Sequence, residues 1–349
     1  MKIRITAIFI TAMAFILSSC SFDLFNLNSK PVEAEDFMMG TVITQKVYGQ
    51  EAKAATEEVR QRLKAIEELM TINAPGGDIN KLNEAAGKNA VILTKETINI
   101  LATAKEYAQI SGGAFDVTIG PLVKAWGIFT DHPRIPGREE IERLKKLTDD
   151  KTLEVDTANS TAKLEMPGQI VDLGGIAKGY SGDEAIKIYK KHGIKSAYIN
   201  LGGNVVVLGK KPDGKLWRIG IQNPRAENGY YLGIVEVTDK AVVTSGDYER
   251  FFEKDGVRYH HILDPKTGAP SDSGLISATI ITDISMDADA LSTAVFVLGL
   301  EKGMALVESL KGVEAILVTK DKEVYATEGI KSSFTFSDDS KEFNYVEKR

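Results

Sequence analysis

The stretch that decides the fold is "SAYINLGGNVVVLG", residues 196–209, in which branched and aromatic residues surround a pair of glycines. Such residues favour extended backbone, and glycines inside an extended run are typical of a bulge. The stretch therefore predicts a strand with a glycine bulge. Further extended runs, broken by Gly, Asn or Asp, are "LWRIGIQN", "YLGIVEV", "AVVTSG", "YHHIL", "LISATIITD" and "AILVT".

Helical periodicity alternates with these extended runs. Apolar residues such as Val59, Leu63 and Ile66 recur at the spacing of one helix face. The pattern predicts four helices, over residues 51–70, 94–110, 176–191 and from about 286 onward. Helices combined with closely spaced strands predict an α+β fold, a single large domain built on a mainly antiparallel sheet with flanking helices. We expect this domain over residues 37–330, followed by a loosely packed tail over residues 331–349.

The first 19 residues have the pattern of an export signal. Lys2 and Arg4 precede an apolar run that is shorter than the about 20 residues of a membrane-spanning helix. "LSSC" then matches the bacterial lipobox, and Cys20 is the single cysteine of the chain. The sequence predicts a lipoprotein signal peptide, lipidation of Cys20 and a polar tether over residues 20–36. An ordinary signal peptide with an incidental cysteine is the alternative.

Composition limits the possible partners. The 349 residues are 43% hydrophobic and 26% charged, enough for a full core in one large domain or two modest ones. The formal net charge of −6 argues against a nucleic-acid partner, because neutralising a phosphate backbone needs positive charge. A ligand that bears phosphate would need local help from a cation or a helix N-terminus.

The segment "ISMDADALSTAV", residues 284–295, carries the first candidate site. Asp287 and Asp289 precede an apolar helical run, where acidic residues serve as caps. Asp289 and Thr293 also form an i, i+4 pair that places a carboxylate and a hydroxyl on one helix face. Hard oxygens so placed suit Mg²⁺. The residues alone leave capping and metal binding both open.

Two other segments contain candidate binding residues. "VDLGGIAKG" precedes the third predicted helix, where glycines allow a ligand to approach the backbone and Lys178 adds positive charge. The order of residues differs from a phosphate-binding Walker loop, and a tight turn between strand and helix explains the segment equally well. "GGAFDVTIGPLVKAWG", residues 112–127, is interpreted as a loop with a buried tryptophan.

"RYHHILDPKTGAP" places His260 and His261 next to each other in an extended run. Alternation along a strand directs the two rings to opposite faces, so at most one of them serves a given site. A histidine could take a proton from a hydroxyl nucleophile, although a histidine in a strand can also be structural.

Taken in chain order, "MGT", "GGAFDVTIGPLVKAWG", "VDLGGIAKG", "INLGGNV" with "IGIQNPR", "HHILDPKTGAP" and "DADALSTAVFVLG" closely resemble the bacterial FAD:protein FMN transferase family of ApbE-like lipoproteins. The resemblance covers nearly all of the expected globular domain. It implies a Mg²⁺-dependent enzyme outside the cytoplasm, anchored to a membrane through its lipid. Members of the family pass FMN from FAD to a threonine or serine hydroxyl of a partner flavoprotein and release AMP. Their acceptors include subunits of redox pumps and electron-transport complexes.

The resemblance also implies roles for particular residues. His261 matches the catalytic histidine of the family. The metal would be bound by Gly175, through its carbonyl, and by Asp289, Thr293 and Ser292. FAD would contact residues from several segments: Met39, Asn73, Ala114, Phe115, Asp116, Asp172, Lys178, and Ile262 or Leu263.

One position departs from the family. Many members carry an aromatic residue near Asn73, which could stack on a ring of FAD, whereas the residue here is short and polar. We therefore expect some hydrolysis of FAD to FMN and AMP without an acceptor, and room for a second cation. A lipoprotein that binds and stores FAD without catalysis is the alternative function, and a purely structural lipoprotein is a third.

Overall fold

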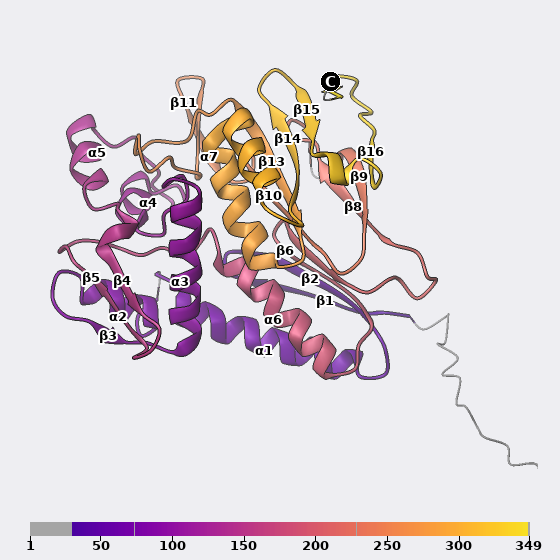
Figure 1. The fold of residues 1–349 in the computed structure, drawn as a ribbon, viewed down its shortest axis with the longest axis horizontal. Coiled ribbons are helices and arrows are strands. Elements are labelled where there is room, and N and C mark those ends of the chain that lie inside the picture. Colours follow the sequence, from indigo (N-terminus) through magenta and orange to yellow (C-terminus); the bar gives the residue numbers. More distant parts are fainter. Residues whose placement is uncertain (1–29, 73, 228, 348–349) are drawn as a thin grey trace, which may run out of the picture.

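The structure is a computed structural model that describes residues 30–72, 74–227 and 229–347. The predicted signal peptide, Cys20 and Asn73 lie outside the described residues. Figure 1 shows a large sheet whose one face is covered by long helices, with a smaller group of helices and short strands beside it.

Within the described ranges, nine strands form the large sheet. Neighbouring strands pair antiparallel except for the last two, which are parallel. Across the sheet the strands are β1 (Val32–Met38), β2 (Thr41–Tyr48), β6 (Ser196–Leu201), β7 (Asn204–Leu208), β10 (Ala241–Gly246), β13 (Leu275–Thr282), β14 (Glu314–Thr319), β15 (Glu323–Ala326) and β17 (Asn344–Tyr345). The predicted α+β fold on a mainly antiparallel sheet is confirmed.

Three smaller sheets complete the strands in the described part of the chain. They are β16 (Phe334–Phe336) with β9 (Tyr231–Val237) and β8 (Trp217–Gln222); β3 (Val91–Ile92) with β5 (Thr161–Leu164) and β4 (Leu153–Asp156); and the hairpin of β11 (Phe251–Lys254) and β12 (Val257–His260).

The predicted glycine bulge is wrong, because the paired glycines end one strand and start another. Leu201 pairs with Asn204, and Gly202 and Gly203 form the turn between β6 and β7. Both glycines have positive φ, at 59° and 94°, which a tight two-residue hairpin turn requires and which side chains disfavour. The side-chain oxygen of Asn200 accepts the N–H of Gly203 at 2.8 Å and fixes the turn.

The predicted helices are present with nearly the expected bounds: α1 (Ala52–Met70), α3 (Lys95–Ile110), α6 (Ala177–Lys191) and α7 (Ser285–Ser309). Shorter helices were not predicted: α2 (Asp78–Glu84), α4 (Gly120–Trp126), α5 (Arg138–Lys145) and the 3₁₀ turns Asp150–Thr152 and Glu328–Ile330. The interpretation of residues 112–127 as a loop is therefore wrong in part. Its tryptophan is buried as expected, at the end of α4.

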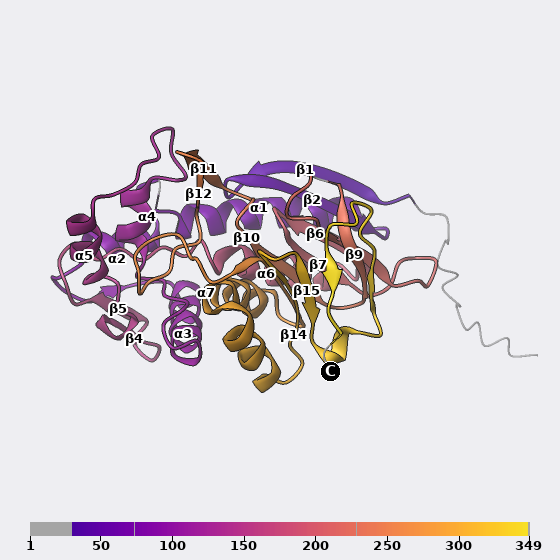
Figure 2. The same ribbon diagram turned by 90° about the horizontal axis from the view of Figure 1, so that it is seen from above.

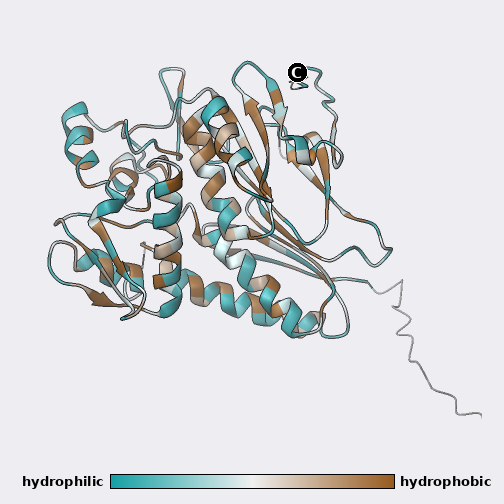
Figure 3. Ribbon diagram, viewed as in Figure 1, coloured by the Kyte–Doolittle hydropathy of each residue, from teal (hydrophilic) through white to brown (hydrophobic). Residues whose placement is uncertain are grey.

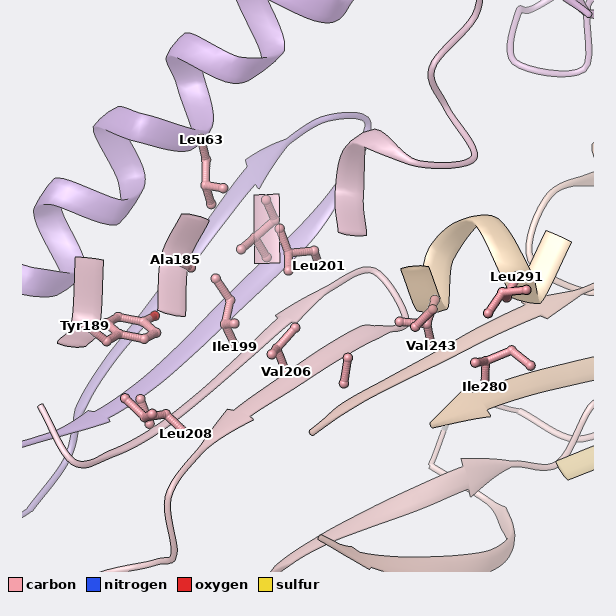
Figure 4. Close-up of a cluster of buried hydrophobic side chains, with 14 of the residues drawn as sticks. Leu63, Ala185, Tyr189, Ile199, Leu201, Val206, Leu208, Val243, Ile280 and Leu291 are labelled. Atoms are coloured by element: carbon pink, nitrogen blue, oxygen red, sulfur yellow. The ribbon is translucent and has the colours of Figure 1, made fainter. Parts of the chain in front are cut away.

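Alternation along the strands buries both faces of the large sheet. In β7, Val206 and Leu208 face α1, α6 and α7, whereas Val205 and Val207 face the small sheet of β8, β9 and β16. Figure 4 shows the helix side, where Leu63 of α1 and Tyr189 of α6 lie over the strands. The sheet is thus a rigid platform between two apolar layers.

A second core joins the smaller group of elements to the start of α6 and α7. It contains α2, α3 and the sheet of β3, β4 and β5, together with Phe115 and Ile176. Ala290 and Ala294 of α7 complete it. Figure 2 shows this group beside the large sheet, so the start of α7 lies where the two cores meet.

Helix α7 is apolar along most of its length (Figure 3). By length and composition it could cross a membrane, but 56% of its most apolar stretch is buried inside the fold. It is interrupted at Gly299, whose φ of 81° is not helical. A side chain there would lie 2.8 Å from the carbonyl oxygen of Ser273, so the break brings α7 close to the chain before β13.

Both predicted ends of the domain differ from the structure. Strand β1 begins at Val32, so the last residues of the predicted tether belong to the sheet. The predicted loose tail over residues 331–349 contains β16 and β17, which pair with β9 and β15. Phe334 and Phe343 are buried in the core between the two sheets. Their apolar side chains explain why the tail packs despite its charge.

Candidate active site

Helices α6 and α7 cross closely at their first turns. The carboxylate of Asp289 accepts the N–H of Gly179 at 2.8 Å, and the Nζ of Lys178 lies 3.8 Å from its other oxygen. A side chain at Gly179 would lie 2.4 Å from the carbonyl oxygen of Ser285. The glycine therefore permits the crossing, and the crossing places Lys178 beside Asp289.

The glycine turn before α6 also meets α7. A methyl group at Gly175 would lie 3.5 Å from the Oγ1 of Thr293. The hydroxyl of Ser245 at the end of β10 lies 2.8 Å from that of Ser292 and 3.4 Å from that of Thr293. Ser292 donates to the carbonyl oxygen of Asp289 at 2.9 Å, so its hydroxyl serves the helix and Ser245. Oxygen atoms from three separate segments therefore gather at this point.

These donors suit a hard divalent cation. Asp289 supplies a buried carboxylate and Thr293 a hydroxyl, while the peptide of Gly175 lies beside them. Mg²⁺ takes few protein ligands, all oxygen, and fills its remaining positions with water and substrate phosphate. In the residues that the structure describes, no three His, Cys, Asp or Glu side chains gather as in a zinc site. The predicted ligand residues thus lie together and have the chemistry that Mg²⁺ prefers.

The N-terminus of α7 is capped from another helix. Asp183 of α6 accepts the N–H groups of Ser285 and Met286 at 2.8 and 2.9 Å. Asp287, which the sequence offered as a candidate cap, is therefore not the cap, and its carboxylate accepts from the hydroxyl of Tyr107 instead. Burial raises the pKa of Asp183 to about 6, although its two backbone hydrogen bonds act against this rise.

The two adjacent histidines have different partners, and β12 ends at His260. The ring of His260 is buried, with its Nε2 3.0 Å from the carbonyl oxygen of Ser271. The Nδ1 of His261 lies 3.2 Å from the carbonyl oxygen of Arg250, which also accepts the backbone N–H of His261. A carbonyl can only accept, so Nδ1 carries the proton and Nε2 is left as a proton acceptor.

The surroundings of His261 keep its ring neutral. Burial lowers its pKa to about 3, with a smaller contribution from the positive charges of Lys178 and Arg250, while the bond to the carbonyl of Arg250 opposes the shift. Phe129 contacts the ring edge to face at 5.6 Å between centroids. Arg250 stacks on Phe129 and donates to the carbonyl oxygen of Gly40. Arg250 thus joins the histidine to the turn after Met39.

Some predicted FAD contacts lie beside this site. Met39 packs in the core that contains Phe115 and the first turn of α6, and its sulfur lies 3.4 Å from the hydroxyl of Ser181. Its N–H donates to Glu67 at 2.7 Å, which holds the turn. Asp172 accepts the N–H of Gly174 at 2.8 Å within the glycine turn. Burial raises the pKa of Asp172, and the charges of Lys124 and Lys178 oppose that rise.

Other predicted contacts are engaged within the chain. The carboxylate of Asp116 accepts from the backbone and hydroxyl of Thr118 and from the N–H of Asp150. Burial raises its pKa. The side chains of Ala114, Ile262 and Leu263 are buried, the last against α4. These side chains therefore order the loops around the site.

Sequence reasoning missed Ser245, Arg250, Phe129 and Asp183. Ser245 and Arg250 belong to "AVVTSGDYER", residues 241–250, an extended run that ends in a polar loop. Such loops after buried strands frequently carry functional residues, and this signal was available. Phe129 could have been noticed as an aromatic residue in a loop rich in Gly and Pro. The cap by Asp183 joins two distant helices, and no local pattern predicts it.

The sequence matches the ApbE family over residues 39–317. An FAD:protein FMN transferase of Klebsiella pneumoniae is 37% identical, with 82% of this chain and 89% of the relative covered. One of Treponema pallidum is 36% identical, with 84% and 86% covered. A crystal structure of the ApbE protein of Thermotoga maritima has a TM-score of 0.81 at 34% identity and covers 87% of this chain and 99% of its own. The chain belongs to the ApbE family, and the predicted family is confirmed.

Proposed function

We propose that the chain transfers FMN from FAD to a threonine or serine hydroxyl of a partner flavoprotein, depends on Mg²⁺ and releases AMP. The predicted enzyme class, FAD:protein FMN transferase, is confirmed by relatives that bear this name over most of the chain. The observation that carries the mechanism is the meeting of Asp289, Thr293 and the backbone of Gly175 beside Lys178.

The reaction needs a nucleophile, a leaving group and charge stabilisation. The acceptor hydroxyl oxygen forms a bond to the phosphorus of the FMN half of FAD, and the bond from this phosphorus to the bridging oxygen breaks, so AMP leaves. The hydroxyl proton passes to the Nε2 of His261, whose Nδ1 is held by the carbonyl of Arg250. Lys178 supplies a fixed positive charge, and bound Mg²⁺ would offset the charge that builds on the phosphate oxygens.

Burial of the site supports this assignment of His261. A histidine with a pKa of about 3 is neutral at any physiological pH and so remains able to accept a proton. It is a weak base, which suits proton transfer late in the reaction, when the hydroxyl has become more acidic. The contact with Phe129 restrains the ring.

We also propose a side activity and a location, both from the sequence. The polar Asn73 leaves FAD less firmly stacked than an aromatic residue would, so water replaces the acceptor in a fraction of turnovers. The lipobox at Cys20 places the enzyme outside the cytoplasm as a membrane-anchored lipoprotein. Subunits of redox pumps or electron-transport complexes would then be the acceptors.

One experiment tests the transfer. The protein is incubated with FAD, Mg²⁺ and a purified domain that carries a threonine flavinylation site. The proposal expects flavin fluorescence on the acceptor band after denaturing electrophoresis and an equal amount of AMP by chromatography. An acceptor that stays colourless while the protein binds FAD would favour the storage function instead. Omitting Mg²⁺ should stop both products.

A further inference from the structure

Three exposed apolar side chains lie on two segments that Arg250 joins, the β1–β2 hairpin and the loop after α4. Phe37, Val42 and Phe129 are 74%, 47% and 49% exposed, which is unusual for such residues in a folded domain. Phe37 pairs with Val42 across the hairpin of β1 and β2, so both side chains lie on the same face. Scattered apolar residues need no explanation, but grouped ones mark interaction sites.

Arg250 connects the hairpin that carries Phe37 and Val42 to Phe129. Its guanidinium group donates to the carbonyl of Gly40 at the tip of the β1–β2 hairpin and lies 5.3 Å from the centre of the Phe129 ring. Phe129 in turn contacts His261. Figure 2 shows the tip of this hairpin near β11 and the loop that follows α4. The tip of the hairpin, Arg250, Phe129 and the proposed catalytic histidine therefore form one series of contacts.

The sheet face that carries Phe37 and Val42 is also largely uncovered at β1 and β2. The small sheet of β8, β9 and β16 covers this face from β7 to β15, through residues such as Val242 and Ile316. At the far end of β2, Tyr48 packs against this core and contacts Trp217, so the open part of the face is β1 and the residues of β2 nearer the hairpin tip. A hollow of about 350 Å³ lies over these strands, lined by Glu33, Glu35, Thr44, Lys46 and Tyr198 among others. Alternation places Thr44 and Lys46 on the face of Val42.

We propose that Phe37, Val42 and Phe129, together with the open face of β1 and β2, form the docking surface for the acceptor protein. The proposal rests on the FMN transfer proposed above. An acceptor hydroxyl that gives its proton to His261 must pass beside Phe129, because these two rings touch. The chain that carries the hydroxyl then lies over the hairpin, which Arg250 fixes next to the site.

The chemistry of this surface defines the acceptor segment. Phe129 stacks on the guanidinium of Arg250, and Phe37 and Val42 lie on the hairpin whose tip Arg250 contacts. We therefore expect an aliphatic or aromatic side chain next to the acceptor threonine. Such contacts supply binding energy for the protein acceptor and none for FAD. The surface therefore selects the acceptor and leaves flavin binding to the interior of the site.

The test compares the double variant Phe37→Ser/Val42→Ser with the control variant Ile92→Ser. Ile92 is 78% exposed on β3, in the smaller group of elements away from the hairpin. The double variant should raise the KM for the purified acceptor domain about tenfold, while kcat at saturating acceptor and the Kd for FAD stay unchanged. The control should change none of these constants.

Two results would overturn the proposal. The first is an unchanged KM in a double variant whose melting temperature equals that of the unaltered protein. The second is a shift from dimer to monomer in sedimentation with the KM unchanged, which would make the surface a contact between two copies. If the unaltered protein transfers no FMN to the acceptor domain, the proposed function fails, and this outcome is distinct from either result.

Discussion

The backbone of Gly175 lies against the hydroxyl of Thr293: a methyl group on the glycine would be 3.5 Å from the threonine Oγ1 and 3.1 Å from the ring of Phe115. Residues far apart in the chain thereby form one wall of the site. The ring of Phe115 therefore limits the side chain that position 175 can hold.

Replacing Gly175 by alanine should weaken the response to Mg²⁺. The added methyl group would lie 3.1 Å from the ring of Phe115, closer than an ordinary contact, so either the ring or the backbone of Gly175 must shift and the proposed ligand carbonyl moves relative to Thr293. We expect the Mg²⁺ concentration for half-maximal transfer to rise about tenfold. Gly137→Ala is the matched control, because Gly137 has no atom within 4 Å of an added methyl group and an ordinary φ of −67°. A normal Mg²⁺ titration for Gly175→Ala would contradict the ligand geometry.

Asp289→Asn should abolish Mg²⁺-dependent transfer while preserving the fold. The amide oxygen of asparagine can still accept the N–H of Gly179, so we expect a loss of about 1 kcal/mol in the free energy of unfolding. Transfer should fall about 100-fold or more, since the carboxylate charge is gone. Asp287→Asn, which alters the neighbouring carboxylate, should keep most activity. Equal activity in both variants at saturating Mg²⁺ would remove Asp289 from the metal site.

Transfer should stay active at pH values where an exposed histidine is already protonated. The low pKa of His261, about 3, keeps the accepting nitrogen free as the pH falls through 6.5, and activity is lost only on approach to the folded-state pKa. A profile of kcat against pH from 8 to 5 checks this. An acidic limb near pH 6.5 that is absent from the residual activity of His261→Ala would show that His261 has an ordinary pKa. His261→Ala should slow transfer about 100-fold or more and leave FAD binding intact.

Asp183 should make the protein less stable as the pH rises from about 4 to about 6. Its pKa is raised from 3.8 to about 6, so the folded state holds the proton over a range in which the unfolded state has released it. Ionisation then costs folding stability, up to about 3 kcal/mol for this shift. Urea unfolding of the unaltered protein and of Asp183→Asn at several pH values measures the difference. Parallel curves would show that Asp183 titrates normally.

Asn73→Tyr should suppress the hydrolysis of FAD that we propose. A stacked aromatic ring restrains FAD and excludes water, whereas transfer to the acceptor domain needs no water. Chromatography of FAD, FMN and AMP after incubation with Mg²⁺ and no acceptor gives the rate. If FAD remains intact with the unaltered protein, there is no such activity to suppress.

The long helices and the fold class could be predicted because their signals are local. The apolar residues of α1, such as Val59 and Leu63, recur every three or four positions, and this period is visible without knowing what they pack against. The strands are similarly marked by their branched residues. The paired glycines at 202 and 203 led to a wrong prediction, because paired glycines occur both in bulges and in tight turns. The two differ only in which residues pair on either side of the glycines.

The candidate site was predictable in part for a different reason. Asp289 and Thr293 were noticed through their i, i+4 spacing and Gly175 through the family resemblance, and the structure brings them together. Ser245 and Arg250 were missed because their role depends on contacts with α7 and with the β1–β2 hairpin, which no spacing along the chain expresses. The same holds for the tail, where Phe334 and Phe343 pack in a core built largely from strands far earlier in the chain.

The strands of the large sheet lie in the order in which a ribosome makes them, from β1 at one edge to β17 at the other. Each new strand can therefore join an edge that its predecessors have already built, and the chain between β2 and β6 folds as an insertion beside it. Because each strand is added at the edge of the sheet, no late strand has to insert between two strands that are already paired. The consequence is that the growing edge offers unpaired backbone groups to each strand as it emerges, down to β17, which pairs with β15.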